Sequence, residues 1–150
     1  MIDELIIMRQ DGDILFYNNY TDAKCDHNLL PNLFAALQQF AETILRSDLK
    51  EIKFEDNRYV FLKDRIAIAA RTGDQHASEK VREIIVNIKD KFIEKFGMLN
   101  DFSGEMTTFN SFENELSEIL PNKTPKISSQ DLLEQFFGIK INGKKILNAL

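Results

Sequence analysis

The chain has 150 residues, of which 43% are hydrophobic and 29% charged, and a formal net charge of −5. This length and composition fit one globular domain with its own core. The acidic balance disfavours a general role in nucleic-acid binding, which needs lysines and arginines to neutralise phosphates. A single cysteine, Cys25, excludes an internal disulfide and fits a reducing, cytoplasmic compartment. Neither a signal peptide nor a membrane span is predicted.

The first predicted element is a β-hairpin. Apolar runs at residues 5–9 and 14–17 flank a polar turn that contains Asp11 and Gly12. An Asp-Gly pair between two apolar runs is a strong hairpin signal, because glycine accepts the positive φ that a tight turn requires. We therefore expect two antiparallel strands at the start of the chain.

A long helix is predicted next, over residues 29–45. Pro31 fits its first turn, where the missing N–H leaves no hydrogen bond unmade. Glu42 is the only charged residue in the helix, whereas a solvent-facing helix usually carries more charge. Two interpretations stay open: the helix is sandwiched within the monomer, or it forms an interface with another chain. Its apolar residues keep the helical period and form one wide stripe: Leu30, Leu33, Phe34, Leu37, Phe40, Ala41 and Ile44.

Three short strands are expected after this helix, over residues 51–54, 58–62 and 65–70. The turns between them are so short that neighbouring strands must be antiparallel, which makes the group a meander. We interpret four basic residues here as outward positions that discourage edge pairing, rather than as contacts to an acidic partner or lipid phosphate: Lys53, Arg58, Lys63 and Arg65.

Two further helices are predicted. The first covers residues 76–96, with Asp74 as a plausible N-cap and a charged, solvated face. The second covers 111–120, where Asn110 and Glu113 have the spacing of a capping box. The inward stripe of the longer helix consists of Val81, Ile84, Ile85, Ile88, Phe92 and Phe96.

The chain beyond residue 120 is expected to be separate from a domain at 1–120. Two prolines make 121–127 a linker. The tail at 128–150 is predicted to hold a helix that is capped by residues 128–131, and then a hairpin-like ribbon within 139–146 that contains an Asn-Gly turn. Elements this small cannot hold a core alone, so the tail must dock on the main body or on another molecule.

No motif for catalysis, metal binding or nucleotide binding stands out. The six glycines form no phosphate-binding loop. Cys25 and His27 are close in sequence, but His76 is the only other histidine, and zinc usually takes four ligands. Sequence neighbours rarely point at each other as nucleophile and base. We interpret this segment as a loop, and the sequence predicts a protein that is not an enzyme and has no cofactor and no metal.

The order of the predicted elements resembles that of longin-like domains, which belong to the profilin-like group together with roadblock domains. Residues 6–17 are similar to the longin entry hairpin, 33–41 to the first-helix segment of archaeal longin-like proteins, and 53–61 to their central hairpin. The likeness covers about residues 1–120 and rests on chain order. It implies an α+β fold with a five-stranded antiparallel sheet, in the order ββ-α-βββ-α-α, and helices packed on both faces.

Longin-like domains serve in SNAREs, adaptors, tethers and small-GTPase regulators, and they often pair as dimers. The resemblance implies a non-catalytic scaffold that binds a Ras-like GTPase or another longin- or roadblock-type chain as a homo- or heterodimer, with at most peripheral membrane association. A SNARE role is not expected, because no heptad coiled coil or membrane anchor follows the domain. An exposed sheet edge is expected at the interface, together with Leu33, Leu37, Gln38, Phe40 and Ile44.

A small-molecule sensor is the alternative hypothesis, since profilin-like sheets also resemble those of PAS and GAF domains. Those domains usually place several short helices between strands two and three, where this sequence has one long helix. An apolar pocket that retains a ligand would favour the sensor.

Overall fold

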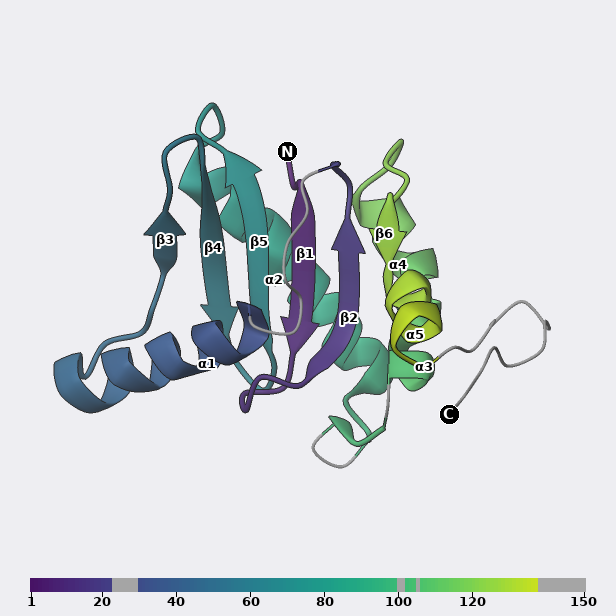
Figure 1. The fold of residues 1–150 in the computed structure, drawn as a ribbon, viewed down its shortest axis with the longest axis horizontal. Coiled ribbons are helices and arrows are strands. Elements are labelled where there is room, and N and C mark those ends of the chain that lie inside the picture. Colours follow the sequence, from purple (N-terminus) through teal and green to yellow (C-terminus); the bar gives the residue numbers. More distant parts are fainter. Residues whose placement is uncertain (23–29, 100–101, 105, 138–150) are drawn as a thin grey trace.

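The computed structural model describes residues 1–22, 30–99, 102–104 and 106–137. They form an α+β fold around one sheet with the strand order β3-β4-β5-β1-β2-β6, in which every neighbouring pair is antiparallel. Figure 1 shows α1 and α5 in front of this sheet and the long helix α2 behind it.

Strands β1 (Glu4–Met8) and β2 (Ile14–Asn19) form the N-terminal hairpin, which confirms the first prediction. In the turn, Gly12 has a φ of 102°, a conformation that glycine adopts without strain. The backbone N–H of Arg9 donates to the carbonyl oxygen of Asp13 at 2.8 Å and closes the turn.

Strands β3 (Glu51–Lys53), β4 (Asn57–Lys63) and β5 (Ala67–Gly73) form the predicted meander. Strand β5 pairs with β1 and joins the meander to the hairpin. The short strand β3 is left at one edge of the sheet.

The prediction of five strands is wrong, because a sixth strand, β6 (Ile127–Ser128), pairs with β2. Asn18 of β2 lies opposite Ser128, and the N–H of Lys126 donates to the carbonyl of Asn19 at 2.7 Å. The end of the segment that the sequence predicts as a linker therefore closes the second edge of the sheet. Two residues are too few to show the alternation by which a strand is recognised.

The first predicted helix is present as α1 (Leu30–Phe40) and a π-helical continuation, η1 (Ala41–Leu45). The second is α2 (Ser78–Phe96), but Asp74 is not its N-cap. The helix begins after Ala77, and Asp74 instead lies 3.9 Å from a guanidinium nitrogen of Arg58.

The third predicted helix is preceded by helical residues, so it consists of α3 (Met106–Phe109), η3 (Asn110–Phe112) and α4 (Glu113–Ile119). The capping box predicted at Asn110 and Glu113 is wrong: the chain is already helical at Asn110, and the Glu113 carboxylate accepts a hydrogen bond from Asn18 Nδ2 at 2.7 Å.

Helix α5 (Ser129–Phe137) begins at the predicted cap. The backbone N–H of Ser128 donates to Asp131 Oδ2 at 2.8 Å, and the Ser128 hydroxyl accepts from the Asp131 N–H. The hairpin predicted within 139–146 and the segment with Cys25 and His27 lie outside the described residues.

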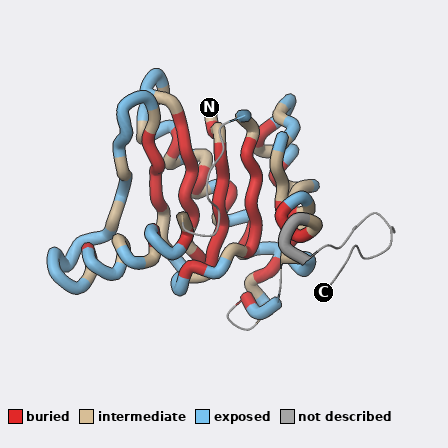
Figure 2. Tube along the Cα trace, in the orientation of Figure 1, coloured by how far each residue is buried: buried red, intermediate tan, exposed pale blue. Residues whose placement is uncertain are grey.

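The core has one cluster on each side of the sheet, and Figure 2 shows the buried residues gathered in the central strands. Behind the sheet, the Phe92 ring lies 5.0 Å from that of Phe112 and 5.5 Å from that of Phe109. The predicted stripe of α2 is buried there, except for the partly buried Ile84. In front, α1 contributes Phe34 and α5 contributes Leu132.

Candidate functional site

Helix α1 has one side against the sheet and one side in solvent. Phe34 is buried on the sheet side, with its ring centroid 5.0 Å from that of Tyr59 and 4.7 Å from that of Phe61. Ala41 is also buried. These contacts anchor the helix, and they determine which of its remaining apolar residues face outward.

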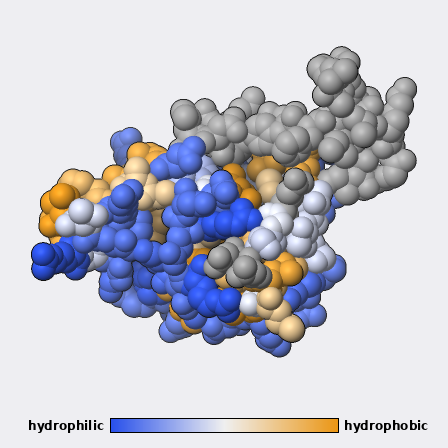
Figure 3. All heavy atoms as spheres, turned by 90° about the horizontal axis from the view of Figure 1, so that it is seen from below, coloured by the Kyte–Doolittle hydropathy of each residue, from blue (hydrophilic) through white to orange (hydrophobic). Residues whose placement is uncertain are grey.

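Four large apolar side chains on α1 and η1 are exposed, and we refer to them as the exposed stripe. Their exposed fractions are 52% for Leu33, 56% for Phe40, and 63% for both Ile44 and Leu45. Figure 3, seen from below, shows apolar side chains gathered at the end of the molecule that α1 and η1 form. A cluster of exposed large apolar residues on one helix is unusual for a surface that contacts only water.

Three of the five residues predicted at an interface belong to this stripe: Leu33, Phe40 and Ile44. The other two, Leu37 and Gln38, are partly buried. The side-chain oxygen of Gln38 accepts a hydrogen bond from the N–H of Leu49 at 3.2 Å, so Gln38 ties the helix to the following loop.

The end of the exposed stripe lies in the π-helical turn. Its hydrogen bonds run from residue i to i+5, as shown by the Arg46 N–H, which donates to the Ala41 carbonyl. Ile44 and Leu45 are the last two residues of this turn, and both side chains are exposed. Arg46 then ends the helix in a left-handed conformation with a φ of 52°.

The charge on this helix lies outside the exposed stripe. Glu42 accepts a hydrogen bond from the Lys63 ammonium, which lowers the pKa of Glu42 below its ordinary value. This ion pair therefore holds the helix to the end of β4. The exposed stripe carries no formal charge of its own.

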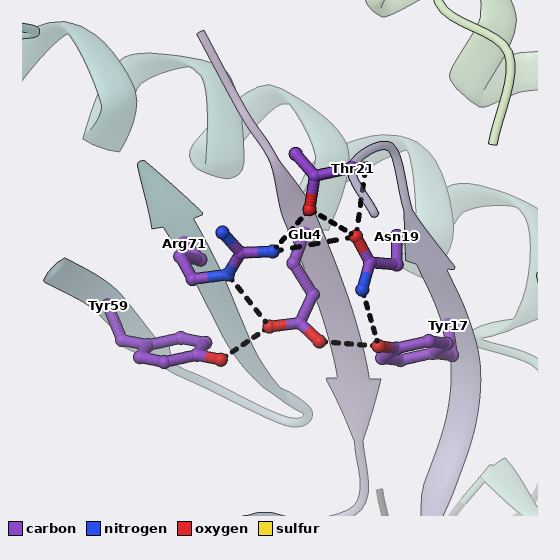
Figure 4. Close-up of polar contacts among 6 residues, drawn as sticks. All are labelled: Glu4, Tyr17, Asn19, Thr21, Tyr59 and Arg71. Atoms are coloured by element: carbon purple, nitrogen blue, oxygen red, sulfur yellow. Dashed lines mark hydrogen bonds and ion pairs between the residues drawn. The ribbon is translucent and has the colours of Figure 1, made fainter. Parts of the chain in front are cut away.

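A buried polar cluster lies on the same side of the sheet, and Figure 4 shows it around the Glu4 carboxylate. One carboxylate oxygen accepts from the Tyr59 hydroxyl and from Arg71 Nε at 3.3 Å, and the other accepts from the Tyr17 hydroxyl. Arg71 also donates to Thr21 Oγ1 at 2.9 Å. Glu4 is fully buried, so these donors replace the water that the carboxylate loses on folding.

Sequence reasoning missed this cluster, although a signal was present. Glu4 precedes Ile6 and Met8 at a spacing of two, which places a carboxylate on an inward-facing side of β1. Its donors come from β2, β4 and β5, so they are recognised only once the pairing of the strands is known. Glu4 receives three hydrogen bonds from within the protein. We therefore interpret the cluster as structural: it joins β1 to strands β2, β4 and β5.

The space between α1 and the sheet is mostly filled. Described residues from α1, β1, β4 and β5 line a hollow of ≈ 30 Å³, including Phe34, Phe61 and Ala67. This volume holds about one water molecule.

The prediction that all four basic residues of the meander point outward is wrong for Arg58. Arg58 is buried and donates to the Gly73 carbonyl at 3.1 Å, to Ser78 Oγ at 3.0 Å and to the His76 carbonyl. It therefore joins β4 to the loop before α2. Lys63 also has an internal role, through Glu42.

Among the described residues, no three His, Cys, Asp or Glu side chains are grouped in a way that would hold a metal ion. Within the same part of the chain, no helix has the length and apolar character needed to cross a bilayer. Comparison with models of known protein families and with curated proteins finds no match for this chain.

Proposed function

We propose that the chain is a non-catalytic interaction module of the longin type, which binds a Ras-like GTPase or another longin- or roadblock-type chain. The observation that carries this proposal is the exposed stripe on α1 and η1: Leu33, Phe40, Ile44 and Leu45. Burying an apolar surface is the main favourable contribution to most protein association, and clusters of this kind mark interaction sites.

The arrangement of strands and helices supports the longin-type assignment. The chain has a hairpin, one long helix, a three-stranded meander and then a long helix behind the sheet. This is the element order on which the resemblance rests. The sixth strand and α5 are additions at the β2 side of the sheet, away from the edge that β3 forms.

The edge strand β3 is the second part of the proposed surface. It is only three residues long, and its exposed residues Glu51 and Lys53 carry opposite charges. Short, charged edges resist unspecific pairing, so any partner there must match the charge pattern. The apolar stripe supplies contact area, and β3 supplies selectivity.

The experiment is affinity capture with three purified chains: the wild type, Phe40→Asp and Met98→Asp. Met98 is 99% exposed on the loop after α2. Met98→Asp therefore introduces the same charge as Phe40→Asp, but at a position away from the exposed stripe. Captured proteins are identified by mass spectrometry, purified and titrated against each chain. We expect a GTPase or longin-type protein that binds the wild type and Met98→Asp but not Phe40→Asp. Equal binding by all three folded chains would refute the role of the stripe.

A further inference from the structure

Two turns and the segment that follows α2 meet at one end of the sheet. Figure 1 shows the turn between β1 and β2 and the turn between β4 and β5 at the lower end of the strands. The side-chain amide of Gln10, in the first turn, donates to the carbonyl of Asp64 in the second. Arg65 Nη2, in the second turn, donates to the Gly97 carbonyl at the end of α2, at 2.9 Å. These hydrogen bonds hold the three segments together.

Two guanidinium groups are positioned by contacts with the segment after α2. Arg9 donates to the carbonyl of Phe102 at 2.8 Å and to the carbonyl of Gly104 at 2.5 Å. The guanidinium carbon of Arg65 lies 5.0 Å from the centroid of the Phe102 ring. Carbonyl oxygens and an aromatic ring orient a guanidinium group, but they do not neutralise its formal charge. The charge at this end of the molecule therefore depends on the carboxylates nearby.

An open hollow of ≈ 460 Å³ lies between these segments. Its described lining residues are Arg9, Gln10, Asp11, Arg65 and Phe102. This volume is within the range of small-molecule sites, which is about 300–1,000 Å³. The charge of Arg9 is balanced by Asp13, whose carboxylate lies 3.4 Å from the guanidinium. The charge that the hollow offers to a ligand is therefore set by its other two ionic residues.

Those two residues, Asp11 and Arg65, form no ion pair with any residue that the structure describes, and they do not pair with each other. Asp64, the neighbour of Arg65, pairs instead with Lys89 at 3.3 Å. One carboxylate oxygen of Asp11 accepts the N–H of Asp13 at 3.0 Å, which fixes the side chain against its turn. Opposite charges that line one hollow without meeting are complementary to a molecule that carries both charges.

We propose that this hollow binds a small zwitterion with one amine and one carboxylate, which is the chemistry of a free amino acid or a short peptide. The carboxylate of the ligand accepts hydrogen bonds from the guanidinium of Arg65, whose planar fork matches two oxygens. The ammonium of the ligand donates to the carboxylate of Asp11. A phosphate ion would be repelled by Asp11, and a simple amine would be repelled by Arg65. No residue of the exposed stripe lines the hollow, so this inference does not rest on the proposed function.

The test is an NMR titration of the isotope-labelled chain, in which the amide chemical shifts are followed. The probes are L-alanine, the dipeptide L-alanyl-L-alanine, acetate and ethylamine, all at the same ionic strength. Because Asp11 and Arg65 are exposed to solvent, we expect a dissociation constant on the order of 1 mM for the tighter-binding zwitterion. The signals of Asp11, Arg65 and Phe102 should shift and saturate. Acetate and ethylamine should each bind roughly tenfold more weakly, since each makes one of the two charged contacts. The relative affinities of L-alanine and the dipeptide distinguish an amino-acid site from a peptide site.

Two variants remove one charge each from the hollow, Arg65→Gln and Asp11→Asn. Asparagine keeps the side-chain oxygen that accepts the N–H of Asp13, so the turn is retained. The control is Lys80→Gln, which removes an exposed charge from the first turn of α2. We expect the two hollow variants to bind the zwitterion roughly tenfold more weakly and the control to bind like the wild type. The site would be overturned if neither zwitterion gave saturable shifts, if acetate bound as tightly as the better zwitterion, or if the folded hollow variants kept the affinity of the wild type.

Discussion

The buried polar cluster around Glu4 allows a quantitative prediction for the Arg71→Met variant. Both side chains are buried, with exposed fractions of 0% for Glu4 and 8% for Arg71. Removing one partner of a buried ion pair leaves an uncompensated charge, and this typically lowers the free energy of unfolding by about 3–5 kcal/mol. We expect Arg71→Met to be destabilised by this amount, which is a large part of the stability of an ordinary domain.

A double variant, Glu4→Gln with Arg71→Met, separates the ion pair from the packing of the two side chains. The neutral amide can still bond to the hydroxyls of Tyr17 and Tyr59, and no unpaired charge remains. We expect the double variant to be more stable than the sum of the single changes predicts, by about 1–3 kcal/mol. Urea denaturation followed by circular dichroism measures all four proteins.

The control is Lys91→Met, which removes a solvent-exposed ion pair with Glu94 on α2. Exposed pairs contribute little, so this change is expected to alter the free energy of unfolding by less than about 1 kcal/mol. The reasoning is refuted if Arg71→Met resembles this control, or if the effects of the Glu4 and Arg71 substitutions simply add.

Three further predictions concern other parts of the fold. Gly12→Ala should destabilise the domain by about 1–2 kcal/mol in urea denaturation, since φ is 102° and a Cβ atom would lie 3.3 Å from the Pro31 carbonyl; an unchanged midpoint would contradict this. Phe34→Ala should cost about 3–5 kcal/mol, whereas Phe40→Asp should leave the thermal midpoint nearly unchanged, and equal losses would contradict the assignment of the two sides of α1. Burial raises the pKa of Glu113 above the ordinary value of 4.5 for a glutamate. The protonated carboxyl therefore contributes stability below pH 4.5, and this contribution is lost as the pH rises through the raised pKa. The wild type should therefore lose stability relative to Glu113→Gln over this rise, and a constant difference would refute the prediction.

Local sequence patterns were sufficient to predict most of the helices and strands. The Asp11-Gly12 turn identifies the hairpin, because the two strands that pair are adjacent in sequence. The helical period identifies α1 and α2, although it gives no sign that α1 ends in a π-helical turn. That change depends on hydrogen bonds within the last turn, which apolar spacing does not encode.

Features that depend on distant segments were not predictable. Strand β6 pairs with a strand more than a hundred positions earlier, and Asp74 turns toward Arg58 of a neighbouring strand instead of capping α2. The period of α1 shows which residues share a side, but only the packing of Phe34 on Tyr59 and Phe61 shows which side is covered. The sequence predicted Leu33, Phe40 and Ile44 at an interface, but their exposure became identifiable only with the fold.

The most direct test of the α1 surface is the solution mass of the wild type, Phe40→Asp and Met98→Asp, measured by light scattering over a range of concentrations. We predict that the mass of the wild type and of Met98→Asp rises above 17.4 kDa with concentration, while Phe40→Asp remains at that value. The same mass curve for all three folded proteins would contradict self-association through the exposed stripe.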